Sequence, residues 1–239
     1  MTDRPVRDDA ARGFVLPPPP IPSVAVAGSD KRFAVRRIVC VGRNYAEHAR
    51  EMGHDPAREP PFFFMKPADA VVDDGASVPY PPLTEDLHHE IELVAAIGEG
   101  GANIAVDKAL DHIFGYAVGV DLTRRDLQQV AKNLRRPWDW AKGFDRSAPI
   151  GALRRAAEIG HPAKGRIWLA VNDVVRQDSD LSEMIWNVPN IIAFLSEAMR
   201  IEPGDLVMTG TPAGVGALKR GDRVSGGVEG VGEIAIAIV

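Results

Sequence analysis

Cysteine is nearly absent from the sequence. One residue, Cys40, occurs in 239, so no disulfide bond can form within the chain. Long apolar runs are missing as well, and no stretch reaches the roughly 18 residues of a membrane-spanning helix. The charged N-terminus MTDRPVRDDAARG lacks the apolar segment of a secretory signal. Together these absences predict a cytoplasmic protein.

An excess of basic residues is also missing. The chain has 28 lysines and arginines against 33 aspartates and glutamates, which gives a net charge of −5. This balance does not indicate a surface for nucleic acid or for an anionic membrane, so we expect neither as a partner. The length and the hydrophobic fraction of 45% suit one large domain, or one domain with an appendage.

Proline is concentrated near the N-terminus. The stretch VLPPPPIPSV, residues 15–24, holds five prolines and can form neither a helix nor a central strand. It suits an extended arm that lies on the body of the protein or on a neighbouring subunit, and a disordered tail fits it equally well. We predict an arm over residues 1–35 and one domain over residues 36–239.

The first half of this domain is predicted to be rich in strands. A short helix is expected over residues 44–53, with Asn44 as its N-cap and Gly53 at its end. Apolar and β-branched runs predict strands at RIVCVG (37–42), PFFFMKP (61–67, short and buried), HHEIELVAAIG (88–98) and FGYAVGVDLT (114–123).

The second half adds helices between further strands. Residues 166–177 predict a hairpin that turns at Asn172-Asp173, and residues 188–199 predict an amphipathic helix. A helix over 123–134 is expected to begin with a capping box, Thr123 to Asp126, and to bury the stripe Leu127, Val130, Ala131 and Leu134. This order lacks the regular alternation of a Rossmann fold or TIM barrel and predicts an α+β fold with a mixed sheet.

Two glutamates interrupt one of the apolar strands. Glu90 and Glu92 are two residues apart and share a strand face, and Asp121 ends the next strong strand. Converging buried carboxylates repel one another unless a cation lies among them, and all-oxygen ligands favour Mg²⁺, Mn²⁺ or Ca²⁺. From spacing alone, salt bridges on an exposed strand face explain the pair as well as a metal site does. His88 has the same parity and is a further candidate ligand, although such a histidine more often has a structural role.

A second group lies on the first predicted helix. His48 and Glu51 are three residues apart and share a helix face. A glutamate beside an imidazole raises its basicity, as a general base that activates water requires. A routine surface pair explains this spacing better when it is taken alone. The helix is short enough to be mobile and to act as a lid.

Basic residues and a glycine-rich loop are candidates for binding an anion. Lys142 lies between aromatic residues and a glycine in PWDWAKGFD, which suits a partly buried lysine. The loop TGTPAGVG (209–216) lacks the ending of a P-loop, but its amides and Thr211 could bind a carboxylate. A turn without a ligand and solvated surface charges are the simpler alternatives. The further basic candidates are Arg43, Lys66, Arg124 and Arg125, and one of the two adjacent arginines must point elsewhere.

Six motifs occur in order along the chain: VGRNYAEHAREMG, FFFMKPADAVV, HHEIELVAAIG, GYAVGVDLTRRDLQ, PWDWAKGFDRSAP and LVMTGTPAGVG. Together they resemble the fumarylacetoacetate hydrolase family, from about Arg36 to the C-terminus, and within it the single-domain bacterial fumarylpyruvate hydrolases. The resemblance implies a mixed β-sandwich roll with short helices, usually a homodimer. It also implies a Mg²⁺ or Mn²⁺ site at Glu90, Glu92 and Asp121.

The resemblance also implies roles for individual residues. His48 and Glu51 would be a water-activating pair on a lid. Lys142 and Gln128 would lie beside the oxygens of the substrate, and the substrate-binding residues would be Arg43, Lys66, Arg125, Gln128 and Thr211. Trp140 stands where a small aliphatic residue is more usual, so we expect a different pocket wall.

The implied activity is hydrolysis of a C–C bond in a 2,4-diketo acid. Fumarylpyruvate, cleaved to fumarate and pyruvate in aromatic-compound degradation, would be the substrate. Relatives use the same metal-enolate chemistry to decarboxylate oxaloacetate-type acids or to isomerise hydroxymuconates, and these remain alternatives. Retention of His48 and Glu51 favours hydrolysis. A non-catalytic metal-binding homologue would be expected to lose this pair or Lys142, and all three residues are present.

Overall fold

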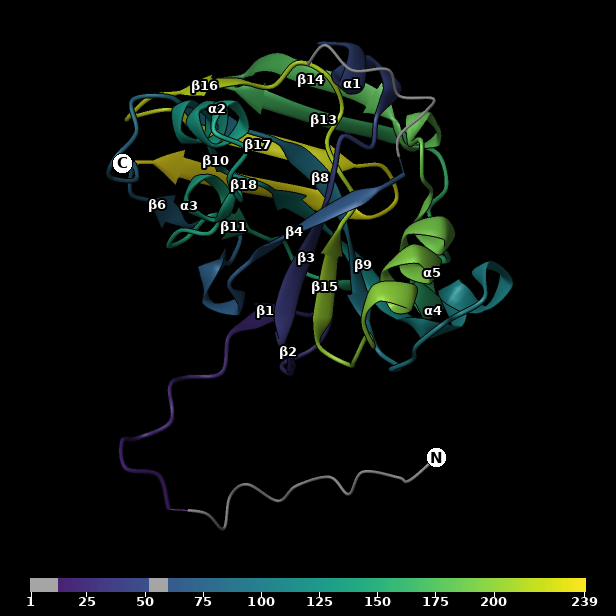
Figure 1. The fold of residues 1–239 in the computed structure, drawn as a ribbon. Coiled ribbons are helices and arrows are strands. Elements are labelled where there is room, and N and C mark those ends of the chain that lie inside the picture. The colour runs from purple at the N-terminus through teal and green to yellow at the C-terminus, as the bar shows by residue number, and fades with distance from the viewer. Residues whose placement is uncertain (1–12, 52–59) are drawn as a thin grey trace.

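Two large mixed sheets form the body of the protein (Figure 1). The computed structural model describes residues 13–51 and 60–239. One sheet has the order β12 (Arg154–Arg155), β9 (Ile113–Val120), β8 (Ile91–Ile97), β15 (Asp205–Met208), β3 (Arg37–Gly42) and β4 (Phe62–Lys66). The other has the order β14 (Val174–Asp180), β13 (Arg166–Val171), β17 (Arg223–Val228), β18 (Gly232–Ile238) and β6 (Ser77–Val78). β15 pairs in parallel with β3, and β18 pairs in parallel with β6, which confirms the predicted α+β mixed-sheet class.

The sheet that contains β3 is buried on both faces. Val39 and Val41 point into the core between the two sheets, whereas Ile38 and Cys40 point into a second apolar cluster on the opposite face. Alternate side chains of a strand point to opposite faces, so a strand buried on both faces requires an unbroken apolar run. This explains why RIVCVG does not alternate with polar residues.

Part of the N-terminal segment closes the second cluster. β1 (Ser23–Ala25) and β2 (Arg32–Ala34) form an antiparallel pair, and Val24, Val26 and Val35 are buried in that cluster. Residues 13–22 are mostly exposed and extend away from the body (Figure 1). The second half of the predicted arm therefore contributes to the core of the domain.

The predicted hairpin and the last helix are confirmed. Asn172 and Asp173 connect β13 to β14 with φ angles of 50° and 62°, as a two-residue hairpin turn requires. Helix α5 (Val188–Ala198) begins after Asn187, whose side chain accepts a hydrogen bond from the Asn190 N–H. No helix in the described parts of the chain has the length and apolar character needed to cross a membrane.

The predicted strand HHEIELVAAIG is divided in the structure. β7 (Leu87–His89) pairs with β10 (Thr123–Arg124) and β16 (Gly216–Leu218) in a separate three-stranded sheet. β8 begins at Ile91 and belongs to the six-stranded sheet. Glu90 lies at the break between the two strands. PFFFMKP forms the edge strand β4 and is only partly buried, because one side of it has no strand neighbour.

The two helices expected to begin with side-chain caps begin differently. α1 (Ala46–Glu51) starts after Tyr45, and the side chain of Asn44 instead bonds backbone groups of distant residues. The rest of the predicted helix, including Gly53, lies outside the described residues. α2 (Arg125–Asn133) has no side-chain cap, because Thr123 belongs to β10.

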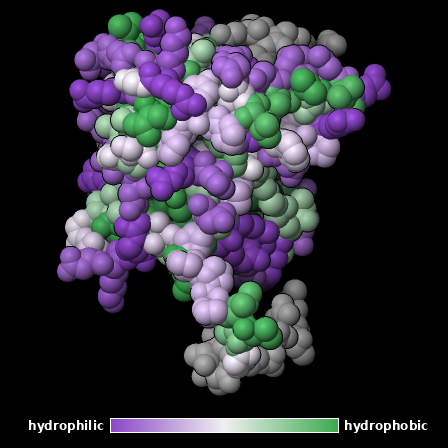
Figure 2. All heavy atoms as spheres, turned by 90° about the vertical axis from the view of Figure 1, so that its left-hand side faces the viewer, coloured by the Kyte–Doolittle hydropathy of each residue, from purple (hydrophilic) through white to green (hydrophobic). Residues whose placement is uncertain are grey.

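The apolar stripe expected on α2 is only partly correct. Ala131 is buried, but Val130 and Leu134 are 51% and 53% exposed. Figure 2 views the molecule from the side where α2 lies in Figure 1 and shows separate apolar patches among mostly hydrophilic residues. The inner face of α2 carries polar residues instead, because it lines a cavity. The remaining short elements are α3 (Asp139–Lys142), α4 (Ala156–Ile159), β5 (Val71–Val72), β11 (Ala148–Pro149), η2 (Ala68–Ala70), η3 (Val106–His112) and η4 (Leu181–Glu183).

The importance of the core between the sheets can be tested with two identical truncations. Val207 in β15 is 0% exposed, whereas Val174 in the hairpin is 52% exposed. Val207→Ala should lower the free energy of unfolding by about 2 kcal/mol, because two buried methyl groups are lost and a cavity remains. Val174→Ala should change it by less than about 0.5 kcal/mol. Urea unfolding measures both, and equal losses would contradict the assigned core.

Candidate active site

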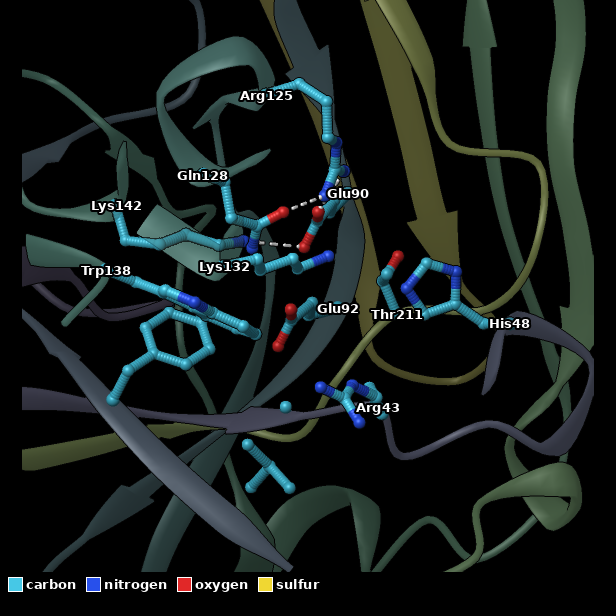
Figure 3. A pocket seen from close by; sticks show the side chains of 13 residues that line it. Arg43, His48, Glu90, Glu92, Arg125, Gln128, Lys132, Trp138, Lys142 and Thr211 are labelled. Carbon is cyan, nitrogen blue, oxygen red and sulfur yellow. Dashed lines mark hydrogen bonds and ion pairs between the residues drawn. The ribbon is translucent and has the colours of Figure 1, made fainter. Parts of the chain in front are cut away.

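A cavity opens beside strands β3, β4 and β8 of the six-stranded sheet (Figure 3). Its walls come from β3, β4, β8, the helices α1, α2 and α3, and the loop after β15. Two glutamates and several cations line it. The sequence-predicted site residues that it brings together are Arg43, His48, Glu90, Glu92, Arg125, Gln128, Lys142 and Thr211.

Three carboxylates meet at the base of this cavity. Glu90, Glu92 and Asp121 are buried, and each offers an oxygen within 4.8 Å of the others. The strand register causes this meeting, because Asp121 directly follows β9, the antiparallel neighbour of β8. The Asp121 N–H donates to the Glu90 carbonyl at 2.8 Å. The exposed-face alternative for the glutamates is therefore wrong.

Two buried lysines offset part of the negative charge. Lys142 Nζ lies 2.8 Å from Glu90 Oε2, 2.6 Å from Asp121 Oδ2 and 2.6 Å from Thr123 Oγ1. Burial opposes the charge on Lys142, but Asp121 and Glu90 outweigh burial and raise the pKa of its ammonium. Lys66 does not line the cavity, and its Nζ lies 2.8 Å from Asp121 Oδ1. Lys66 thus offsets the charge of Asp121 without lining the cavity.

Arg125 pairs with the oxygen of Glu90 that Lys142 does not contact. Its guanidinium forms an ion pair with Glu90 Oε1, and its Nη1 donates to Gln128 Oε1 at 2.6 Å. Burial opposes ionisation of Glu90, but Lys142 and Arg125 outweigh it and hold the pKa of Glu90 well below its usual range. Glu90 is therefore a carboxylate with two cationic partners.

The negative charge of Glu92 is less well compensated than that of Glu90. In the described parts of the chain, the hydrogen-bond donor to Glu92 is the Gly210 N–H, at 2.7 Å. Burial, followed by repulsion from Asp121 and Glu90, raises the pKa of Glu92 well above its usual range. The Lys66 ammonium lies 2.8 Å from Asp121 Oδ1 as an ion pair, but outside the geometry of a hydrogen bond. Glu92 and Asp121 thus retain acceptor capacity that a hard divalent cation such as Mg²⁺ or Mn²⁺ could use.

His88 and Arg124, whose roles the sequence left open, have partners outside the carboxylate cluster. His88 bonds Asp86 through Nε2 at 2.9 Å, and Arg125 Nε lies 3.4 Å from its Nδ1. It is not part of the cluster of candidate ligand atoms in the described residues, so it is not a candidate ligand. Arg124 points away from the cavity and lies over the Phe144 ring at 4.4 Å.

The segment that carries His48 is anchored by Asn44. The Asn44 Nδ2 donates to the carbonyls of Trp186 and Thr209 at 2.8 and 2.7 Å, and its Oδ1 accepts the Trp186 N–H at 2.7 Å. His48 is buried and points into the cavity (Figure 3). Glu51 ends α1, and its side chain lies outside what the structure describes.

A buried network around Gln177 was not predicted. Gln177 Oε1 accepts the Ile91 N–H at 3.1 Å and faces His89 Nδ1 at 3.0 Å, while its Nε2 donates to Thr211 Oγ1 at 2.8 Å. A backbone N–H can only donate, so the orientation of this amide is fixed. Thr211 therefore accepts from Gln177, and its own hydroxyl hydrogen remains available to a ligand.

The structure also adds Lys132 and Trp138 to the cavity wall. Trp140, which the sequence analysis placed in the wall, is 72% exposed and is not a lining residue. The spacing of Arg125, Gln128 and Lys132 is i, i+3, i+7, which places all three on one face of α2. That spacing is the sequence signal that could have identified Lys132.

Comparison with known proteins identifies the family. A family model described as fumarylacetoacetate (FAA) hydrolase C-terminal matches residues 37–239. The chain belongs to the fumarylacetoacetate hydrolase family. This confirms the resemblance and the fold expected from the six sequence motifs.

Similar members of the family differ in the activities for which they are named. A crystal structure of fumarylpyruvate hydrolase from Pseudomonas aeruginosa, in complex with Mn²⁺ and pyruvate, is 51% identical, with a TM-score of 0.94 over 95% of this chain and 99% of that one. A Burkholderia cenocepacia structure, provisionally named a fumarylpyruvate hydrolase, is 58% identical, with a TM-score of 0.89 over 95% and 98%. The mitochondrial oxaloacetate tautomerase FAHD1 of Bos taurus is 41% identical over 82% of this chain and 88% of its own.

The carboxylate cluster of this family member can be tested by metal binding. Glu92→Gln should weaken Mn²⁺ binding by at least about tenfold, the lower end of what loss of even an outer hydrogen-bond partner of a metal site costs. The change removes a charge but keeps the shape of the side chain, so the fold should be retained. Isothermal titration calorimetry measures the affinity, and circular dichroism checks the fold. Glu233→Gln, at an exposed position, is the control. Unchanged Mn²⁺ affinity in Glu92→Gln would contradict the site.

Proposed function

We propose that this protein hydrolyses the C3–C4 bond of a 2,4-diketo acid, with fumarylpyruvate as substrate and fumarate and pyruvate as products. The observation that carries the proposal is the buried cluster of Glu90, Glu92 and Asp121 in a cavity that also contains a histidine and several cations. Similarity to the Pseudomonas fumarylpyruvate hydrolase over nearly the whole chain supports this choice of substrate.

The residues at the base of the cavity would bind the 2-oxo acid end of the substrate. The hydroxyl hydrogen of Thr211 and the guanidinium of Arg125 suit its carboxylate, because a carboxylate accepts hydrogen bonds and is favoured by a nearby cation. The amide of Gln128, held by Arg125, offers its N–H₂ group to a carbonyl. A Mg²⁺ or Mn²⁺ ion held by Glu90, Glu92 and Asp121 would supply Lewis-acid polarisation of the substrate oxygens.

His48 would activate the water that attacks the substrate. Its imidazole takes one proton from water, and the hydroxide oxygen forms a bond to C4. Glu51, on the same helix, would orient the imidazole and stabilise its protonated form. Burial of His48 suits this role, since a base shielded from bulk water keeps a defined position beside the reacting carbon.

Collapse of the adduct would break the C3–C4 bond. The carbonyl re-forms at C4 and releases fumarate, and the electron pair of the broken bond remains with the pyruvate fragment as an enolate. A proton then adds to C3 and completes pyruvate. The ammonium of Lys142, which forms ion pairs with both Glu90 and Asp121, would stabilise the developing negative charge.

Tautomerisation of oxaloacetate is the second candidate function. The observation that favours it is the 41% identity to the bovine oxaloacetate tautomerase. That reaction moves a proton between C3 and the enol oxygen and requires neither water nor C–C cleavage. It therefore differs from hydrolysis in its product, which is oxaloacetate and not pyruvate.

The role of His48 can be tested by substitution. His48→Ala should lower kcat for fumarylpyruvate by about 10²- to 10⁴-fold, the usual contribution of a general base. Binding of Mn²⁺ should change little, because the three carboxylates remain. Loss of substrate absorbance, with chromatography of fumarate and pyruvate, measures turnover. The control is His161→Ala, because His161 is exposed and bonds Tyr116 outside the cavity.

Two outcomes would overturn the proposed hydrolysis. If the Mn²⁺-loaded protein consumes fumarylpyruvate no faster than His48→Ala does, the protein is not this hydrolase. If it instead accelerates enol–keto exchange of oxaloacetate and leaves fumarylpyruvate intact, the tautomerase function is the correct one.

A further inference from the structure

Arg43 and Lys132, two of the cations that line the cavity, lie over a pair of aromatic rings that contact each other. The guanidinium carbon of Arg43 is 5.0 Å from the ring centroid of Phe62, and Lys132 Nζ is 5.5 Å from that of Trp138. The two rings contact each other edge to face, with their centroids 5.3 Å apart. Arg43 and Lys132 are therefore held on one aromatic pair at the same part of the cavity wall.

Like charges brought together in this way repel each other. Burial, together with Arg125 and Arg43, lowers the pKa of Lys132 to about 8. Lys132 is half-buried and points into the cavity (Figure 3), and no carboxylate among the described residues forms an ion pair with it. A bound anion at this place would give Lys132 an ion-pair partner.

The other two lining cations have different partners. Arg125 and Lys142 form ion pairs with Glu90, one from each side. The cavity thus has two cationic regions, one at the carboxylate cluster and one at the aromatic pair, where Lys132 lies. α2 links them, because it presents Arg125 at its first turn and Lys132 at its last turn.

We infer that Lys132, together with Arg43, binds the second carboxylate of a dicarboxylate substrate and selects for substrates that have one. The inference rests on the proposed function, in which the first carboxylate lies at Arg125 and Thr211. A seven-carbon diketo acid with a carboxylate at each end then places one charge in each cationic region. The flat face of Trp138, which lines the cavity, suits the planar unsaturated segment between them.

The first test compares a 2,4-diketo acid that has a distal carboxylate with a shorter one that has none. Fumarylpyruvate and acetylpyruvate share the 2,4-diketo acid group, but acetylpyruvate ends in a methyl group. Lys132→Met should lower the ratio of kcat/KM for fumarylpyruvate to that for acetylpyruvate by about 10- to 100-fold, the cost of losing a hydrogen bond to a charged group. Lys132→Arg should retain most of the preference, and Lys108→Met, at an exposed lysine, should behave as the wild type.

A binding measurement separates this inference from the proposed reaction. Mn²⁺-loaded protein is titrated with 2-oxoheptanedioate and 2-oxoheptanoate, which have the same chain length and differ in the distal carboxylate. The wild type should bind the dicarboxylate more tightly, and Lys132→Met should lose that preference, whether or not the diketo acid is cleaved. If Lys132→Met weakens both ligands and both substrates equally, or neither, the inference is wrong. If the binding preference depends on Lys132 but fumarylpyruvate is not cleaved, only the proposed hydrolysis fails.

Discussion

The mutual repulsion of three buried carboxylates is the constraint on which the site depends. Glu90, Glu92 and Asp121 lie within 4.8 Å of one another in the interior, where charge is costly. Lys142 and Lys66 offset part of this cost, but Glu92 is left with a backbone N–H as its donor. Glu92 thus has the weakest compensation of the three carboxylates, and its free acceptor capacity suits the cluster to a hard divalent cation.

The fold supplies this cluster through one break in one strand. At Glu90 the chain passes from β7, which lies in a small sheet with β10, to β8 of the six-stranded sheet. β8 is packed against apolar clusters on both faces. The same break brings β10 and the start of α2 alongside β7. Helix α2 then carries its polar face across the cavity. A rigid core with two apolar faces therefore holds the reactive groups in fixed positions.

The sequence predicts the features that depend on local pattern. The hairpin at Asn172-Asp173 follows from turn chemistry, and the strands of the large sheet follow from apolar runs. The sequence also predicts the carboxylate cluster, because strand parity and the family motifs point to the same three residues. Pattern alone could not locate the break at Glu90, which depends on pairing with strands that are distant in sequence. It also missed Gln177 and Lys132, whose roles arise from contacts between elements and not from their neighbours in the chain.

Direct location of the metal is the measurement that tests the central claim most closely. Crystals grown with Mn²⁺ and pyruvate, measured at the manganese absorption edge, should show one strong anomalous peak within coordination distance of Glu90, Glu92 and Asp121, with pyruvate beside Thr211. A cavity without a peak at these carboxylates, in crystals that hold Mn²⁺ elsewhere, would contradict the account.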